Sequence, residues 1–173
     1  MADGRTWRAV VGSLVFLVVV PGTVTGWVPF RFTRWQVQPA LVGEPSRAAG
    51  WLLVVAGVAS LVESVLRFAV VGLGTPAPVA PPSRLVVSGQ YRHVRNPMYV
   101  AVVAVVIGQG LVLGSVALLL YGLVLWLFFS GFVLLYEEPT LRARFGASYE
   151  AYRRGVRRWW PRVTPWVESG GQR

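Results

Sequence analysis

Four long apolar runs constrain this chain more than any other feature. They cover residues 9–30, 48–73, 97–113 and 115–136. The hydrocarbon core of a bilayer needs about 20 apolar residues in a helix, and a spanning segment must satisfy its backbone groups internally. With 54% of its 173 residues hydrophobic, the chain is too apolar for a soluble domain of this length. The runs therefore predict an all-α, multi-pass integral membrane protein with about four transmembrane helices.

The first run should be a retained anchor helix, because it is long and no convincing signal-peptide cleavage site follows it. Pro21 and Gly22 are expected to kink this helix. Residues 31–47 mix polar and apolar side chains and predict a loop, with or without a dip into the interface, rather than a further span.

The third and fourth runs are separated only by Gly114 and Ser115, which predicts a tight antiparallel helical hairpin. Glycines at 108, 110 and 114 would allow close helix packing, although random occurrence in an apolar run explains them equally well.

The second run contains two charged residues, Glu63 and Arg67, four positions apart on one helix face. We expect a structural ion pair near the helix end; the alternative is that Glu63 lines a substrate cavity. Residues 74–82 hold four prolines and predict an extended segment, which is either a linker or a pocket wall. This segment divides the chain into an N-terminal pair of helices, residues 1–73, and a core, residues 74–173.

A polar segment at residues 88–99, here called the central segment, lies between the second and third runs. Asn96 has the residue type of a helix N-cap, and Pro97 suits the first helical turn. The N-terminus of the helix, together with nearby cations, favours binding of a carboxylate or phosphate. Tyr91 and Tyr99 would attract a cationic centre, or would belong to an interfacial aromatic belt. A ligand with an acidic end and a positive centre suits this segment.

The fourth run is followed by Glu137-Glu138-Pro139, which we expect to end the span. Because the hairpin is antiparallel, these glutamates should return to the membrane surface beside Asn96 and Pro97. Acidic residues at a helix C-terminus have the wrong sign for the helix dipole. That placement favours a functional role, such as holding an ammonium group, over simple solvation.

Residues 141–160 alternate arginines with apolar and aromatic side chains at helical spacing and predict an amphipathic interfacial helix. With four spans, 13 of the 17 arginines lie on the side of the central segment and the two termini. The positive-inside rule places that side in the cytoplasm.

The formal net charge of +10 indicates contact with anionic lipid headgroups rather than nucleic acid, since no nucleic-acid-binding motif is visible. The sequence has no cysteine and a single histidine, His93. It therefore predicts no disulfide, no cysteine nucleophile and no metal site.

Two motifs resemble the isoprenylcysteine carboxyl methyltransferase and phospholipid methyltransferase superfamily. The first is Gly89-x-Tyr91-x-x-x-Arg95-Asn96-Pro97-x-Tyr99, and the second begins at Glu137-Glu138-x-x-Leu141. The resemblance covers about residues 74–165. It implies an integral membrane methyltransferase that uses S-adenosylmethionine at the cytoplasmic surface and a lipophilic or small-molecule acceptor.

The resemblance also implies roles for individual residues. Glu137 would hold the ammonium of the cofactor, Asn96 and the helix N-terminus its carboxylate, and the two tyrosines would shape the sulfonium pocket. Arg95 would orient the substrate or pair with Glu138. The implied catalytic residues are Arg95, Glu137 and Glu138, and the implied cofactor-binding residues are Leu85, Val86, Gly89, Tyr91, Asn96, Pro97, Met98, Tyr99 and Glu137.

Two positions differ from the pattern of this superfamily. Asn96 stands where many members have a histidine, and asparagine cannot act as a titrating base. Val133 stands where the eukaryotic prenylcysteine enzymes have an arginine that contacts the substrate carboxylate. An NADPH-dependent membrane reductase of the sterol type and a non-catalytic membrane scaffold are the alternative functions.

Overall fold

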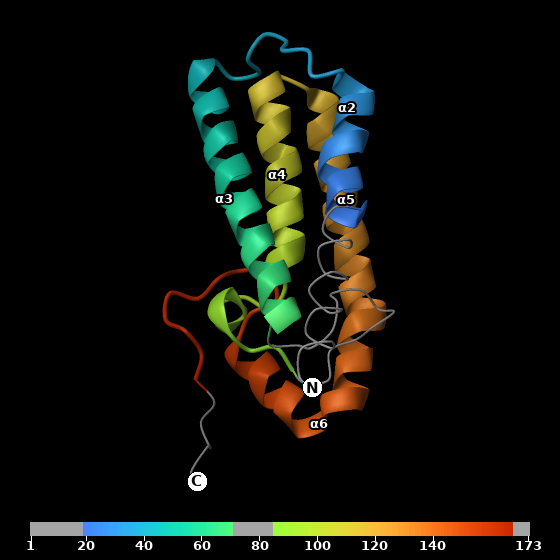
Figure 1. Cartoon of the computed structure of the whole chain (residues 1–173), viewed down its shortest axis with the longest axis vertical. Helices are drawn as coiled ribbons and strands as arrows, with labels where there is room; N and C mark the ends of the chain where they lie inside the picture. Colours follow the sequence, from blue (N-terminus) through green and yellow to red (C-terminus); the bar gives the residue numbers. More distant parts are fainter. Residues whose placement is uncertain (1–18, 71–84, 168–173) are drawn as a thin grey trace, which may run out of the picture.

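A computed structural model describes residues 19–70 and 85–167 of the protein, with the side chains of residues 68–70 excepted (Figure 1). The described part is helical, and its only strand-like feature is an isolated bridge between Leu41 and Gly43. The α-helices are α2 (Val28–Thr33), α3 (Glu44–Val70), α4 (Pro97–Leu113), α5 (Val116–Phe132) and α6 (Glu138–Gly155). Two π-helical turns, η1 (Thr23–Trp27) and η3 (Val133–Glu137), and one 3₁₀ turn, η2 (Gly89–Arg92), complete the elements.

The long helices lie side by side in one bundle, and α6 turns across one end of it (Figure 1). In the described residues, Glu44–Arg67 and Val116–Gly155 are long and apolar enough to cross a membrane, and α4 is a shorter apolar helix. This arrangement confirms the predicted all-α, polytopic fold. Because about 20 helical residues suffice to cross the hydrocarbon core, the span that starts at Val116 ends near Tyr136, and α6 lies outside it.

The outer faces of the bundle carry large apolar side chains that nothing in the described chain covers. Leu52 on α3 is 72% exposed, and Leu127 and Phe128 on α5 are 62% and 63% exposed. A soluble monomer rarely exposes a continuous apolar surface of this kind, whereas lipid chains contact it without cost. The exposure pattern therefore agrees with an integral membrane protein.

Helices α3 and α4 pack closely because glycines face each other across their interface. A Cβ built on Gly108 would lie 2.6 Å from the Gly50 carbonyl oxygen, and one on Gly57 would lie 2.9 Å from the Ala101 carbonyl oxygen. A methyl group does not fit at those distances, so the two backbones approach only because side chains are absent. For Gly108, the packing interpretation of the sequence is confirmed.

The hairpin between α4 and α5 forms as predicted. Gly114 adopts a φ of +68° and ends α4, while the Ser115 hydroxyl caps α5 by accepting from the Leu118 amide at 3.4 Å. The loop between α2 and α3 covers this turn, since the Gln38 amide donates to the Leu113 carbonyl at 2.9 Å. The loop is shorter than residues 31–47, because α2 continues to Thr33 and α3 already begins at Glu44.

The N-terminal helix is described from Val19 onward, and it widens into η1 directly after Pro21 and Gly22. A π-turn leaves carbonyl groups without the usual partners. The Thr25 carbonyl accepts from Gln109 at 2.8 Å, and the Val24 carbonyl accepts from Tyr121 at 3.3 Å. At the site of the predicted kink near Pro21, the structure has a π-turn. Side chains of α4 and α5 donate hydrogen bonds to its free carbonyl groups. Residues 9–18 of the predicted anchor and the proline-rich segment 74–82 lie outside the described residues.

The sequence predicts that Glu137-Glu138-Pro139 ends the fourth span and lies at a helix C-terminus; the second part of this prediction is wrong, because the helix does not end there. The chain stays helical from α5 through η3 into α6. Pro139 occupies the first turn of α6, and the π-turn immediately before it accommodates its ring and missing N–H. Glu137 and Glu138 therefore lie within a continuous helical path, and the argument from an unfavourable helix dipole does not apply to them.

Candidate functional site

The Gln90 side chain connects the central segment to α3 through three hydrogen bonds. Its amide nitrogen donates to the Ser60 carbonyl at 2.6 Å and to the Ser64 hydroxyl at 2.7 Å, while its amide oxygen accepts from the Ser60 hydroxyl at 2.6 Å. Sequence reasoning missed Gln90. The available signal was the pair of serines four residues apart near the end of an apolar helix, since such serines need a polar partner.

Gly89 has a structural reason to be glycine. It adopts a φ of +55°, and a Cβ there would collide with the side chains of Glu63 and Arg67. Those two side chains form the predicted ion pair, with 3.2 Å between Arg67 Nε and Glu63 Oε1. The turn of the central segment is thus packed directly onto the charged end of α3.

Asn96 stands at the N-cap position of α4, as predicted, but its side chain does not cap the helix. Instead, its amide nitrogen donates to the backbone carbonyl of Arg158, in the tail, at 3.2 Å. The sequence did not predict this contact with the tail, residues 156–167: the Arg158 carbonyl takes the Asn96 side chain away from the helix end.

The hairpin brings the start of α4 to the glutamate pair, as the sequence predicts. The Tyr99 hydroxyl donates to Glu137 Oε2 at 2.9 Å, and the Tyr99 ring stacks on Phe129 of α5 at 4.7 Å between centroids. Both contacts connect α4 to the α5–η3 path. A carboxylate is therefore held at the N-terminal end of a helix, beside an aromatic face.

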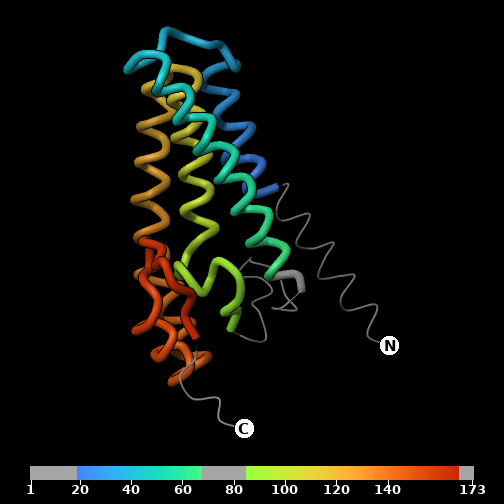
Figure 2. The backbone as a smooth tube through the Cα atoms, turned by 90° about the vertical axis from the view of Figure 1, so that its left-hand side faces the viewer, coloured from blue at the N-terminus to red at the C-terminus, as the bar shows by residue number. Residues whose placement is uncertain are grey.

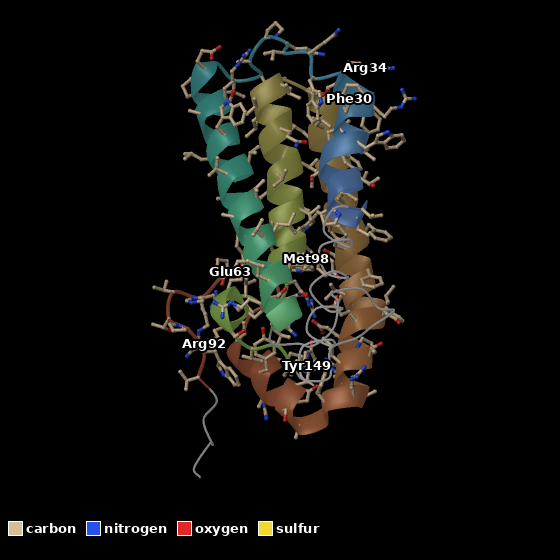
Figure 3. All side chains as sticks on the ribbon, in the orientation of Figure 1. Phe30, Arg34, Glu63, Arg92, Met98 and Tyr149 are labelled. Carbon is tan, nitrogen blue, oxygen red and sulfur yellow. The ribbon has the colours of Figure 1, made fainter. Side chains whose placement is uncertain are left out.

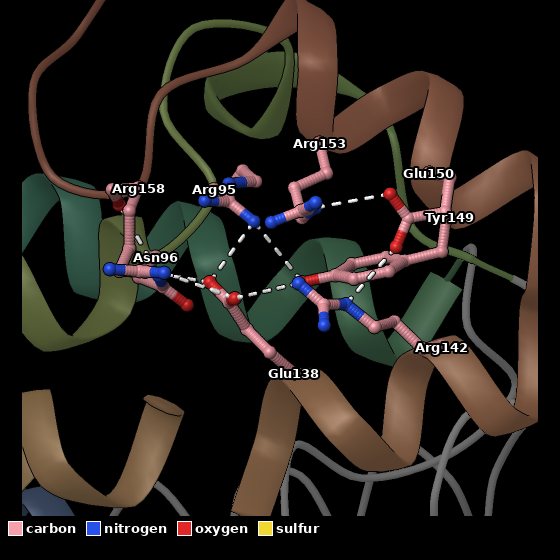
Figure 4. A network of polar contacts seen from close by, with 8 residues as sticks. All are labelled: Arg95, Asn96, Glu138, Arg142, Tyr149, Glu150, Arg153 and Arg158. Carbon is pink, nitrogen blue, oxygen red and sulfur yellow. Dashed lines mark hydrogen bonds and ion pairs between the residues drawn. The ribbon is translucent and has the colours of Figure 1, made fainter. Parts of the chain in front are cut away.

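Glu138 is held in an ionic cluster at the start of α6 (Figure 4). Its carboxylate lies 3.1 Å from Arg95 Nη1 and accepts from Arg158 Nε at 2.6 Å and Nη2 at 3.0 Å. Burial opposes its ionisation, but the hydrogen bonds from Arg158 and the charges of Arg95 and Arg142 outweigh that effect. Together they hold the pKa of this carboxyl below its usual value. The predicted Arg95–Glu138 pair is present, and Arg158 is a partner that sequence reasoning missed.

The tail, residues 156–167, runs back along the central segment (Figure 2). The backbone amides of Arg162 and Trp166 donate to the carbonyls of His93 and Arg92, each at 2.9 Å. The Tyr152 hydroxyl donates to the Tyr91 carbonyl at 2.6 Å. The sequence predicts an amphipathic interfacial helix over residues 141–160, but α6 ends at Gly155 and residues 156–160 are not helical. These residues belong to the tail, which contacts the central segment.

The remaining predicted cofactor residues have different surroundings. Leu85 packs against a buried cluster formed by Tyr149 and Tyr152 of α6 and Val156 of the tail. Met98 packs into the core between the long helices. Val86, Tyr91 and Pro97 are buried, and burial raises the pKa of the Tyr91 phenol, which keeps it protonated. Figure 3 shows Met98, Glu63, Arg92 and Tyr149 at the same end of the bundle, opposite Phe30 and Arg34.

A cavity of about 860 Å³ opens beside η2. Of the predicted catalytic and cofactor-binding residues only Gly89 lines it, so the cavity is distinct from the Tyr99–Glu137 pair. Glu63, whose alternative role was to line a substrate cavity, also lines it. Among the described residues, no group of three or more histidine, cysteine or acidic side chains is arranged to hold a metal ion. The cavity is lined by Glu63, Arg67, Val87, Ser88, Gly89, Gln90, Arg92, His93, Pro165, Trp166 and Val167.

The fold and these contacts define a helical membrane protein with a cluster of charged and hydrogen-bonding side chains where α4 begins and η3 ends. Residues 45–148 match the phospholipid methyltransferase family. This match extends over more than half of the chain, and the protein belongs to that family.

A stretch of 73 residues is 45% identical to the protein-S-isoprenylcysteine O-methyltransferase of Schizosaccharomyces pombe. It covers 42% of this chain and 30% of the yeast protein, so the match spans less than a third of that relative. No solved structure shows significant similarity to the chain.

Proposed function

We propose that this protein is an integral membrane methyltransferase that uses S-adenosylmethionine and acts on a lipophilic acceptor. The observation that carries the proposal is the Tyr99–Glu137 pair at the N-terminal end of α4. It lies within the residues that match the phospholipid methyltransferase family. The curated relative, named as an O-methyltransferase of isoprenylcysteine, supports the same chemistry.

The polar groups at the start of α4 match the charged groups of such a cofactor. An ammonium group needs a carboxylate, which Glu137 provides, and a carboxylate group needs donors, which the N-terminal end of α4 provides. The Tyr99 ring offers an aromatic face to a positive centre. Bound S-adenosylmethionine supplies an electrophilic methyl group, and the protein's contribution is to hold the two reactants in line.

Within this proposal the predicted catalytic residues have separate roles. Glu137 contacts the cofactor. Arg95 and Glu138 are bound to each other and to the tail, which makes them supports of the site rather than groups that touch the methyl donor.

The acceptor is proposed to enter from the membrane, because the outer faces of α3 and α5 are apolar and lie against lipid. Two chemical classes fit: the carboxylate of an isoprenylated cysteine, the group in the name of the yeast relative, and the headgroup amine of a phospholipid, the lipid class in the family name. Val133, where the eukaryotic prenylcysteine enzymes have an arginine, is 1% exposed and offers no charge to a carboxylate. This position favours the amine.

A transfer assay tests the proposal. Purified protein in vesicles receives S-adenosylmethionine with a radiolabelled methyl group, together with either a prenylcysteine or phosphatidylethanolamine. Label in the lipid extract supports methyl transfer; label released as methanol by mild alkali indicates an ester, and alkali-stable label indicates an N-methyl product. No transfer to either acceptor or to a total membrane lipid extract would contradict the proposal.

A further inference from the structure

Arg158 contacts both motifs of the site, although it lies beyond residue 148, where the family match ends. Its guanidinium donates to both oxygens of Glu138, at 2.6 and 3.0 Å, and its backbone carbonyl accepts from the Asn96 amide at 3.2 Å. One tail residue therefore contacts the start of α4 and the start of α6 at once. Figure 4 shows these contacts converging between the two helices.

The residues on either side of Arg158 attach to the same place. The Arg157 carbonyl accepts from the Arg95 amide at 3.0 Å, and the Trp159 ring packs against Trp126 of α5 at 4.7 Å between centroids. Three consecutive residues thus bind the central segment, the glutamate pair and the hairpin. The Arg158 side chain is the part of this attachment that can be removed without changing the backbone.

Arg158 is one of three arginines that neutralise the Glu138 carboxylate. The Glu138 side chain is 5% exposed, and Arg95 lies 3.1 Å from it, with Arg142 at 3.9 Å. A buried charge left without a partner would destabilise the fold strongly. Because Arg95 remains, loss of the Arg158 side chain removes the ionic contact between the tail and α6 while the carboxylate keeps a counter-charge.

We propose that Arg158 is a positioning residue for the cofactor end of the site. Its bidentate hold on Glu138 docks the tail, and the docked tail fixes Asn96 and the first turn of α4 next to Glu137. This inference rests on the proposed function for its effect on the cofactor, but the docking itself is independent of any ligand.

The test compares Arg158→Met with Arg154→Met, which removes the same charge from an exposed position on α6. Hydrogen exchange of residues 96–100 should be faster in Arg158→Met and unchanged in Arg154→Met. Equal exchange in both variants would overturn the proposal, whether or not the protein binds a cofactor.

A second readout is the affinity for S-adenosylhomocysteine, measured by calorimetry in detergent. Two charge-assisted hydrogen bonds are lost, so we expect roughly tenfold weaker binding in Arg158→Met, partial recovery in Arg158→Lys, and no change in Arg154→Met.

A double variant tests whether Arg158 acts through Glu138. Adding Arg158→Met to Glu138→Gln should cause little further loss of affinity for S-adenosylhomocysteine, because both substitutions remove the same contact. Additive losses in the double variant would contradict the proposed route. Absence of binding by the unsubstituted protein would refute the proposed function instead, and the exchange result would still decide the docking.

Discussion

Glu137 and Glu138 are adjacent in sequence but occupy different environments. Glu137 accepts one hydrogen bond from the Tyr99 phenol, whereas Glu138 is surrounded by the guanidinium groups of Arg95, Arg158 and Arg142. Consecutive residues on a helix point about 100° apart, so the two carboxylates face different neighbours. Among the described residues, no ion pair joins Glu137 to a cation, which agrees with its proposed role toward a cationic ligand.

Replacing Glu137 by glutamine should weaken S-adenosylhomocysteine binding by about tenfold or more, since a charged partner for the ammonium group is lost. Glu44→Gln is the matched control, because Glu44 lies at the opposite end of α3 and its side chain is 80% exposed. Calorimetry with both variants checks this. Equal affinities would remove Glu137 from the cofactor site.

Glu138 predicts a pH dependence of stability. Its pKa is lower in the folded protein than in an unfolded chain, so its contribution is present above the usual glutamate pKa and is lost as the pH falls through the folded-state value. The difference in Tm between the unsubstituted protein and Glu138→Gln in detergent should therefore be largest near neutral pH. It should shrink as the solution is acidified; a difference that does not vary with pH would contradict the assignment.

At the scale of single residues, the sequence predicts the Arg95–Glu138 pair and the return of the glutamates to the start of α4, because an antiparallel hairpin returns to the surface from which it started. The hydrogen bond from Tyr99 to Glu137 follows from the same return but was not predicted. The Asn96–Arg158 contact could not be predicted in this way, since it depends on the path of the tail after α6. Nothing in the local sequence encodes that path.

At the scale of helices, the interface between α3 and α4 depends on the absence of side chains at Gly50, Gly57 and Gly108. In a membrane, lipid and apolar side chains are alike in polarity, so close packing rather than hydrophobicity holds the helices together. The proximity of α3 also matters for the site, because α3 anchors the central segment through Gln90.

Gly108→Ala should lower the free energy of unfolding by about 1–3 kcal/mol, because the added methyl meets a backbone carbonyl that cannot move aside easily. Gly131→Ala is the control: it adds the same methyl in a helical position with nothing within 4 Å. Thermal unfolding in detergent compares the two. Equal stability losses would show that α3 and α4 do not pack through this glycine.

The helix boundary at Glu137-Glu138-Pro139 shows where reasoning from sequence fails at this scale. A proline after an apolar run normally indicates the end of a helix. Here the π-turn η3 makes room for the ring of Pro139, so the helix continues past it. The Thr140 hydroxyl donates to the Tyr136 carbonyl at 2.7 Å. Two compensating local features of this kind cannot be recognised from residue types alone.

For the whole molecule, the four predicted spans and the polar end of the bundle follow from composition and from the hairpin. The positions of the apolar runs determine how many times the chain crosses the membrane, and the short Gly114-Ser115 turn determines which ends meet. Composition carries no information on how the tail docks, because many surface paths would bury the same aromatic residues. The orientation of the bundle in the membrane rests on the arginine distribution and is proposed.

Orientation can be tested because the sequence has no cysteine, so any introduced thiol is unique. Val163 in the tail is 96% exposed and Val42 in the loop between α2 and α3 is 79% exposed. We expect Val163→Cys to react with a membrane-impermeant maleimide only after the membrane is opened, and Val42→Cys to react in intact cells or right-side-out vesicles. The reverse pattern would place the central segment outside the cytoplasm.

The most direct test of the proposed methyltransferase site is calorimetric titration of the detergent-purified protein with S-adenosylhomocysteine, with NADPH titrated in parallel. We expect saturable binding of S-adenosylhomocysteine at one site per chain and no binding of NADPH. Binding of NADPH alone would make the protein a reductase. Binding of neither, in detergent and again in lipid nanodiscs, would contradict the methyltransferase site.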